Sequence, residues 1–201
     1  MPGADLLSAL GPLVVKEFVE PAWCAKLLEE LQAAARTPAE VTDRTRDYVD
    51  ARFRSTSEVQ APAVAAELVR ARLHDLRPEM ERHFGMALEG CERPQFLAYR
   101  EGDFFVPHDD ASRDPAAAEY LRARKITVVV FLNRQTTQPA AGCYCGGSLV
   151  LYGLLADPRL RDYGVPVAAE PGLLVAFPAA TKHEVTPIAY GERYVIVSWF
   201  F

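Results

Sequence analysis

The chain has 201 residues, of which 50% are hydrophobic and 24% are charged. This composition is ordinary for a globular protein and excludes a wholly disordered, collagen-like or coiled-coil chain. The 22 basic residues are outnumbered by 27 acidic ones, which gives a formal net charge of −5. A mildly acidic chain without a basic block is a poor candidate for binding nucleic acid, so we expect no nucleic-acid partner.

The cysteines and the apolar runs indicate the compartment. Four cysteines are too few for a disulfide scaffold, and we interpret Cys143 and Cys145 as ordinary reduced thiols. The most apolar run, Ile126–Leu132, is far shorter than the roughly 20 residues that span a bilayer. The N-terminus shows no basic segment ahead of an apolar stretch, as a signal peptide would. We therefore expect a cytoplasmic protein without a membrane partner; its oligomeric state is left open.

The first third of the chain has a helical pattern. A short opening strand is expected over Val14–Val19, followed by a helix that begins at Pro21, where a missing N–H needs no partner. A second helix is expected over Pro62–Phe84, kinked or split at Pro78. Between the helices, the mixed charges of Thr42–Glu58 predict a solvated loop.

After Pro94 the pattern changes to short β-rich runs that are separated by turn residues. A short helix is expected after Asp114, inserted among the strands. Seven runs are expected to form strands: Gln95–Arg100, Phe104–His108, Ile126–Leu132, Ser148–Tyr152, Gly172–Phe177, His183–Ile188 and Arg193–Phe201. We therefore expect one α+β domain over residues 1–201, with a helical support over about 1–90 and a jelly-roll core over about 91–201.

His108 and Asp110 lie two positions apart at the end of an expected strand. Residues i and i+2 of a strand point to the same face, so these two side chains would project together while Asp109 points away. His183, in another expected strand, would supply a third ligand. Two histidines and one carboxylate on one side of a metal leave positions open opposite, as in non-haem Fe(II) oxygenases. A His-x-Asp pair alone is a weak signal.

Arg193 follows His183 by ten residues, with a turn through residues 189–191 between them. A hairpin would fold the Arg193 strand back beside the His183 strand. Alternate residues from Arg193 to Trp199 would then form an apolar wall that carries one cation at its end. A guanidinium on such a wall needs an anion, and its planar fork matches a carboxylate; the alternative is a surface arginine at a hairpin end. A metal at one end and an arginine at the other would suit a small dicarboxylate.

Five motifs occur in a fixed order over roughly residues 95–201. They are Tyr99-Arg100-Glu101-Gly102 with Pro107-His108-Asp109-Asp110, then Ile126–Asn133, Gly146-Gly147-Ser148-Leu149, Phe177 with His183-Glu184-Val185, and Gly191-Glu192-Arg193-Tyr194 ending at Trp199-Phe200. In these motifs the chain resembles the Fe(II)/2-oxoglutarate-dependent dioxygenases, most closely their prolyl 4-hydroxylase-like branch. The resemblance implies a double-stranded β-helix, which is a jelly roll, with N-terminal helices packed against one sheet.

The resemblance also implies the cofactors and their ligands. Fe(II) would be the metal, 2-oxoglutarate and O₂ the cosubstrates, and ascorbate a candidate reductant. His108, Asp110 and His183 would ligate Fe(II). Arg193 would pair with the far carboxylate of 2-oxoglutarate, and Tyr99 would hydrogen-bond that carboxylate or lie alongside it.

The resemblance assigns the walls of the cosubstrate pocket as well. Four residues are expected to line it: Thr127, Val185, Val197 and Trp199. Phe131 stands where some members of the family have a tyrosine, and it offers no hydroxyl. We also interpret Thr42–Glu58 and Asn133–Cys145 as mobile flaps over the iron, because both segments are long and polar.

The implied reaction is hydroxylation of an unactivated C–H group, with release of succinate and CO₂. A prolyl residue or another amino acid is the expected substrate, peptidyl or small. One alternative is a hydroxylase of a free or carrier-bound small molecule. A second is a non-catalytic jelly-roll ligand-binding or sensor domain, which would be expected to lack a metal ligand or the arginine. A halogenating relative would need the carboxylate position vacated, and Asp110 occupies it.

Overall fold

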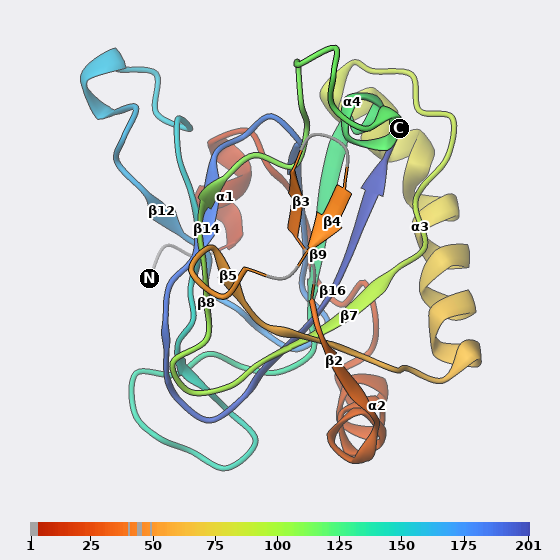
Figure 1. Cartoon of the computed structure of the whole chain (residues 1–201), viewed down its shortest axis with the longest axis vertical. Helices are drawn as coiled ribbons and strands as arrows, with labels where there is room; N and C mark the ends of the chain where they lie inside the picture. The colour runs from red at the N-terminus through yellow and green to blue at the C-terminus, as the bar shows by residue number, and fades with distance from the viewer. Residues whose placement is uncertain (1–3, 40, 44–45, 49) are drawn as a thin grey trace.

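The computed structural model describes residues 4–39, 41–43, 46–48 and 50–201, and Figure 1 shows how its elements are arranged. The helices are α1 (Ala4–Ala9), α2 (Pro21–Ala33), α3 (Ala63–Phe84), α4 (Glu119–Ala123) and the 3₁₀ helix η1 (Pro158–Leu160). The strands are β1 (Leu13–Val15), β2 (Arg36–Pro38), β3 (Val41–Asp43), β4 (Arg46–Tyr48), β5 (Arg54–Ser55), β6 (Ser57–Val59), β7 (Gln95–Tyr99), β8 (Phe104–His108), β9 (Ile126–Phe131), β10 (Cys145–Gly146), β11 (Leu149–Leu151), β12 (Val165–Pro166), β13 (Leu174–Pro178), β14 (His183–Val185), β15 (Ile188–Tyr190) and β16 (Arg193–Phe200).

Two antiparallel sheets form the core. The larger has the strand order β1-β13-β9-β16-β7-β6-β2, and the smaller has the order β12-β11-β14-β8-β5. Two short ribbons, β10–β15 and β3–β4, accompany them. All seven strands expected after Pro94 are present, although the His183–Ile188 run is divided between β14 and the start of β15. The expected α+β jelly roll is confirmed.

Strand β16 separates two apolar cores because its side chains alternate between the faces of the larger sheet. Tyr194 and Ile196 pack with buried residues of α2 and α3 on the outer face. Val195 packs between the sheets with Phe131 of β9 and Leu149 of β11. Figure 1 shows α3 running along one side of the larger sheet. The helices thus cover one sheet, which leaves the space between the sheets for a site.

The first 90 residues contain more strand than expected. The expected opening strand over Val14–Val19 is present as β1, but it ends at Val15. Strands β1, β2 and β6 extend the larger sheet, and β5 extends the smaller one. Between β5 and β6 the chain crosses from one sheet to the other at Thr56, whose hydroxyl donates to the Ala98 carbonyl at 2.9 Å. The segment 42–58, predicted as a solvated loop, therefore contains most of β3 and all of β4 and β5, with the first two residues of β6 and an exposed turn over 51–53. Residues 44, 45 and 49 lie outside the described residues. Strands of two or three residues are too short to produce a recognisable period.

Two helix predictions need correction. Helix α3 is not split at Pro78, because it continues through this exposed residue to Phe84; a kink at Pro78 stays a prediction. The helix ends where expected, at Gly85 in the left-handed conformation (φ 64°). Helix α4 begins at Glu119, later than expected, because Asp114 instead closes a turn in which its side chain accepts from the Ala116 N–H at 2.9 Å.

The remaining expectations concern cysteines and membrane spans. All four cysteines are free, in line with their interpretation as thiols, and Cys24 and Cys145 are buried. Among the described residues, no helix combines the length and the apolar character that crossing a bilayer requires.

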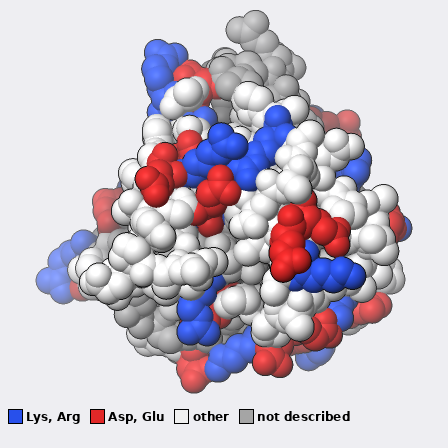
Figure 2. Space-filling view, turned by 90° about the horizontal axis from the view of Figure 1, so that it is seen from below, with Lys and Arg blue, Asp and Glu red and all other residues white. Residues whose placement is uncertain are grey.

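Glu192 connects β2 to the beginning of β16. Its carboxylate accepts two hydrogen bonds from Arg36, at 2.9 and 3.1 Å, and one from Arg100 at 3.2 Å. The Tyr194 hydroxyl donates to the same carboxylate. Hydrogen bonding by Arg36 is the main cause that lowers the pKa of Glu192. Elsewhere on the surface, acidic and basic side chains also lie next to each other, as on the face in Figure 2.

Replacing Glu192 should destabilise the fold in a pH-dependent way. We expect Glu192→Gln to lower the free energy of unfolding at pH 7 by about 1–3 kcal/mol, because charge-assisted hydrogen bonds are lost. Since the pKa of Glu192 is lowered in the folded state, its stabilisation is present above the ordinary pKa of 4.5 and is lost as the pH falls below it. Urea denaturation at pH 7 and pH 3.5 measures both effects.

Glu67 provides the matched control, because it pairs with Arg70 on the exposed surface of α3. Glu67→Gln should change the free energy of unfolding by less than about 0.5 kcal/mol. Equal losses in the two variants would contradict a special role of Glu192.

Candidate metal centre and cosubstrate pocket

His108 and His183 lie opposite each other on the neighbouring strands β8 and β14. The Nδ1 atom of each ring contacts a backbone carbonyl two residues earlier, that of Val106 at 2.7 Å and that of Thr181 at 2.9 Å. A carbonyl accepts only, so both Nδ1 atoms carry a proton, and in the neutral ring the lone pair is then on Nε2. The two histidines are thus oriented as ligands by the backbone itself.

Aromatic rings pack around the two imidazoles. Phe105 stacks on His108 with centroids 3.5 Å apart, and Phe177 meets His183 edge-on at 5.0 Å. Burial is the main cause that lowers the pKa of His108 to about 4. Its imidazole is therefore neutral near pH 7, the form that binds a metal.

Asp110 brings a carboxylate to both imidazoles. Its Oδ1 lies 3.6 Å from His108 Nε2, and its Oδ2 lies 3.4 Å from His183 Nε2. One ligand atom from each of the three residues lies within 4.8 Å of the other two. Thr127 donates its hydroxyl to Asp110 Oδ2 at 2.7 Å, which fixes the orientation of the carboxylate.

The charge state of Asp110 suits a cation. Burial by itself would raise the pKa of Asp110, but the two neighbouring imidazoles and the hydrogen bond from Thr127 outweigh it and lower that pKa to about 2. Asp110 is therefore an anion at neutral pH. Together, two imidazoles and one carboxylate form a donor set that Fe(II) binds in non-haem oxygenases.

Strand alternation is not the reason that His108 and Asp110 point together. Strand β8 ends at His108, so Asp110 lies outside the strand and the alternation of side chains along a strand does not apply to it. Asp110 lies in a bend, where its backbone N–H donates to the Ala179 carbonyl at 2.9 Å. Asp109 is exposed, as expected. The predicted grouping is present, but a backbone contact to the segment before β14 produces it.

The predicted hairpin between the His183 and Arg193 strands is wrong. Strand β14 belongs to the smaller sheet, whereas β16 lies in the larger sheet between β9 and β7. Between them, β15 pairs with β10, and the chain crosses from one sheet to the other before Arg193. Arg193 and the histidines are therefore contributed by the two facing sheets.

Arg193 is buried, with 1% of its surface exposed. Its guanidinium carbon lies 4.9 Å from the ring centroid of Tyr99 and 5.4 Å from that of Phe131. Its Nε and Nη1 atoms have no hydrogen-bond partner among the described residues. Aromatic faces stabilise a cation only in part, so a buried guanidinium in this state is suited to receive an anion.

One cavity of about 1040 Å³ joins the His108–Asp110–His183 group to Arg193. The other residues expected at the pocket also line it: Tyr99, Thr127, Val185, Val197 and Trp199. Phe53, Arg54 and Glu58, from the first predicted flap, line the cavity too. A metal and a small dicarboxylate therefore both find suitable partners in one connected space.

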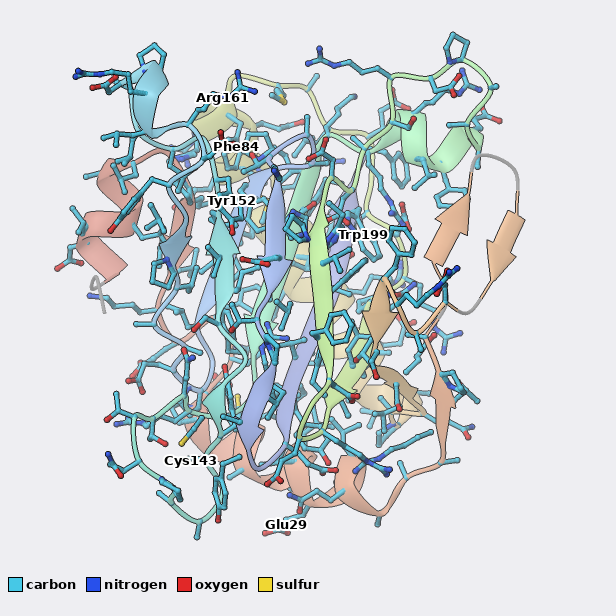
Figure 3. The ribbon with its side chains drawn as sticks, turned by 60° about the vertical axis from the view of Figure 1, so that its left-hand side comes forward. Glu29, Phe84, Cys143, Tyr152, Arg161 and Trp199 are labelled. Carbon is cyan, nitrogen blue, oxygen red and sulfur yellow. The ribbon has the colours of Figure 1, made fainter. Side chains whose placement is uncertain are left out.

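The second predicted flap, Asn133–Cys145, does not lie over this site. None of its residues lines the cavity in the described part of the chain. Figure 3 shows Cys143 at the bottom of the molecule, far from Trp199, which lies beside the site. The same segment contains Tyr144, which the sequence reasoning missed and which is completely buried against the core. A large aromatic residue within an otherwise polar loop was the one available signal.

Comparison with known proteins adds the family. The family model of the 2OG-Fe(II) oxygenase superfamily matches residues 94–201. A PKHD-type hydroxylase of Sphingopyxis alaskensis is 30% identical over 106 residues, a match that spans 53% of this chain and 42% of that relative. A PKHD-type hydroxylase of Pseudomonas putida is 26% identical over 178 residues, or 87% of this chain and 71% of that relative.

Solved structures agree on the fold. The crystal structure of a Pseudomonas putida prolyl-4-hydroxylase superposes with a TM-score of 0.70 and 25% identity, covering 98% of this chain and 95% of that one. A prolyl hydroxylase from Trichoplax adhaerens, at 20% identity, gives a TM-score of 0.66 and covers 98% of this chain and 86% of that one. The family match spans more than half of the sequence and includes every residue that the geometry groups around the cavity from Gln95 onward. This chain thus belongs to the 2OG-Fe(II) oxygenase superfamily, whose members use Fe(II), 2-oxoglutarate and O₂.

Proposed function

We propose that the chain is an Fe(II)- and 2-oxoglutarate-dependent hydroxylase. His108, Asp110 and His183 hold Fe(II), and Arg193 binds the distal carboxylate of 2-oxoglutarate. One observation carries this proposal. A single cavity has the three metal-ligand residues at one end and Arg193 at the other, and among the described residues two nitrogens of that buried guanidinium group have no hydrogen-bond partner.

The protein supplies the geometry for the reaction. With 2-oxoglutarate and O₂, bound Fe(II) supplies the oxidising chemistry: one oxygen atom goes into succinate as CO₂ leaves, and the other goes into a substrate C–H bond. The Nδ1 hydrogen bonds of His108 and His183 hold both imidazoles in the ligating tautomer. Thr127 holds the Asp110 carboxylate, and Arg193 fixes the far end of the dicarboxylate.

Apolar side chains line part of the pocket. Val185, Val197 and Trp199 line the cavity along with Thr127, so three of the four residues expected around the cosubstrate are largely apolar. Next to such surfaces the Arg193–carboxylate pair is stronger than it would be in water.

The favoured substrate is a prolyl residue or another amino-acid residue. The cavity of about 1040 Å³ is at the upper end of the range for pockets that hold drug-sized ligands, so it leaves room beyond a small dicarboxylate. The similarity to a protein described as a prolyl-4-hydroxylase extends over nearly the whole chain. A hydroxylase of a free or carrier-bound small molecule remains the alternative. His108, Asp110, His183 and Arg193 all line the same cavity, which supports an enzyme rather than a sensor domain.

Asp110 and Asp109 should differ sharply in metal binding. We expect Asp110→Asn to weaken Fe(II) or Mn(II) binding by about a hundredfold or more, since a ligand charge is removed from a buried site. Asp109→Asn should change it less than twofold, because Asp109 is exposed. Anaerobic metal titration by calorimetry measures both. Equal effects would contradict the assignment of Asp110.

The two histidines should be essential for turnover. His108→Ala and His183→Ala should abolish 2-oxoglutarate-dependent succinate formation, because each removes one of three protein ligands. Succinate release is assayed against a panel of proline-containing peptides and free amino acids, which also tests the substrate class. The exposed His74 provides the control: His74→Ala should leave the rate unchanged. Substantial succinate formation in either ligand variant would contradict the proposal.

Arg193 should control the affinity for the cosubstrate. A hydrogen bond to a charged group contributes about 1.5–3 kcal/mol, so Arg193→Ala should raise the KM for 2-oxoglutarate by roughly tenfold to a few hundredfold. Arg193→Lys should recover part of this, because it restores the charge without the planar fork. Metal affinity should barely change in either variant. An unchanged KM in Arg193→Ala would refute the role of Arg193.

A further inference from the structure

Tyr144 is a buried polar side chain for which the reaction has so far offered no role. It is 0% exposed and packs in the core between the two sheets. Its backbone is fixed on both sides: its N–H donates to the Arg134 carbonyl at 3.1 Å, and its carbonyl accepts from the Thr136 N–H at 2.8 Å. The ring therefore has a defined position, although it belongs to a long connection.

The hydroxyl of Tyr144 is inaccessible to water, and within the described chain no acceptor takes a hydrogen bond from it. A buried hydroxyl in this state costs free energy, and such groups are rare in native proteins. Within the described chain, the buried Nε and Nη1 atoms of Arg193 also have no hydrogen-bond partner. Three unsatisfied polar atoms on two side chains call for one shared partner.

Gly147 shows that these two side chains adjoin. A Cβ atom placed on Gly147 would lie 3.4 Å from Arg193 Cδ and 3.4 Å from a ring carbon of Tyr144. It would also collide with Ile188, at 2.1 Å. The absence of a side chain at residue 147 thus lets the Tyr144 ring and the aliphatic part of Arg193 lie close to the same point.

The charges agree with this contact. Burial raises the pKa of Tyr144, and the positive charge of Arg193 and hydrogen bonding of its guanidinium to the phenol oxygen oppose that rise. Tyr144 therefore keeps its proton at neutral pH and can donate it. Arg193 N–H groups can only donate, so a shared partner for both side chains must be an acceptor, and a carboxylate is the acceptor that also satisfies the charge.

We infer that the Tyr144 hydroxyl is a second donor to the distal carboxylate of 2-oxoglutarate, beside the guanidinium of Arg193. Arg193 lines the cavity and Tyr144 does not, so the Tyr144 hydroxyl would meet the carboxylate alongside the guanidinium. Phe131 also lies against the guanidinium but has no hydroxyl to offer. The inference rests on the proposed function and adds a residue to the same pocket.

The test compares two 2-oxo acids that differ at the far end. Pyruvate has the 2-oxo acid group of 2-oxoglutarate but lacks the distal carboxylate. Binding of each acid to the Mn(II)-loaded protein is measured by calorimetry in wild type and in Tyr144→Phe. We expect the Kd for 2-oxoglutarate to rise roughly tenfold to a hundredfold and the Kd for pyruvate to stay within twofold. A 2-oxoglutarate Kd within twofold of wild type, or an equal rise for both acids, would overturn the inference.

Thermal melting without ligand separates binding from structure. Because Tyr144→Phe removes a hydroxyl that is unsatisfied in the described structure, the Tm of the ligand-free variant should be equal to or above that of wild type. A clearly lower Tm would show that the hydroxyl supports the fold, and would overturn the inference. Tyr190 is partly exposed on β15, and Tyr190→Phe should leave both Kd values unchanged.

Arg193→Ala in the same titration distinguishes failure of the proposed function from failure of the role of Tyr144. If it leaves the 2-oxoglutarate Kd unchanged, the proposed function fails at this end of the cavity. If Arg193→Ala weakens 2-oxoglutarate binding and Tyr144→Phe does not, only the role of Tyr144 fails.

Discussion

The pairing of β8 with β14 is the constraint on which the site depends. It sets His108 opposite His183, and the backbone carbonyls of Val106 and Thr181 then fix both rings in the same tautomer. A slip of one residue in this pairing would turn one imidazole to the other face of the sheet. The metal-ligand group is therefore a property of strand register, and the Asp110 carboxylate is added to it by a bend that follows β8.

At the opposite end of the cavity lies Arg193, whose Nε and Nη1 atoms have no hydrogen-bond partner within the described residues. Arg193 is held between Tyr99 and Phe131, whose rings offset part of the cost of burying the charge. Under the proposed function, its Nε and Nη1 groups gain a partner when the distal carboxylate of 2-oxoglutarate binds. Such a group lowers the stability of the free protein and raises the affinity for the ligand, a common trade at binding sites. The apolar walls between the two ends strengthen both interactions.

Much of the fold could be predicted from sequence because the later strands are long enough to show their pattern. The residues around the cavity were identifiable from spacing and from the resemblance, since His108, Asp110, His183 and Arg193 stand in recognisable motifs. Contacts between the two sheets could not be predicted. The alternation of residues along a strand shows which side chains share a face, but it does not show which sheet the strand joins. For this reason the hairpin before Arg193 was wrongly expected. Tyr144 was missed because a side chain buried from a loop has no period.

Strand β16 lies between β9 and β7 in the larger sheet, and it carries both Arg193 and Trp199. It is also the last described strand to be synthesised. Until it emerges from the ribosome, β9 and β7 have no partner on their facing edges, and the apolar surfaces on either side of the sheet stay open to water. Closure of the sheet must therefore follow translation of almost all of the described chain, with contacts between residues far apart in sequence, which is the situation in which nascent chains depend on chaperones.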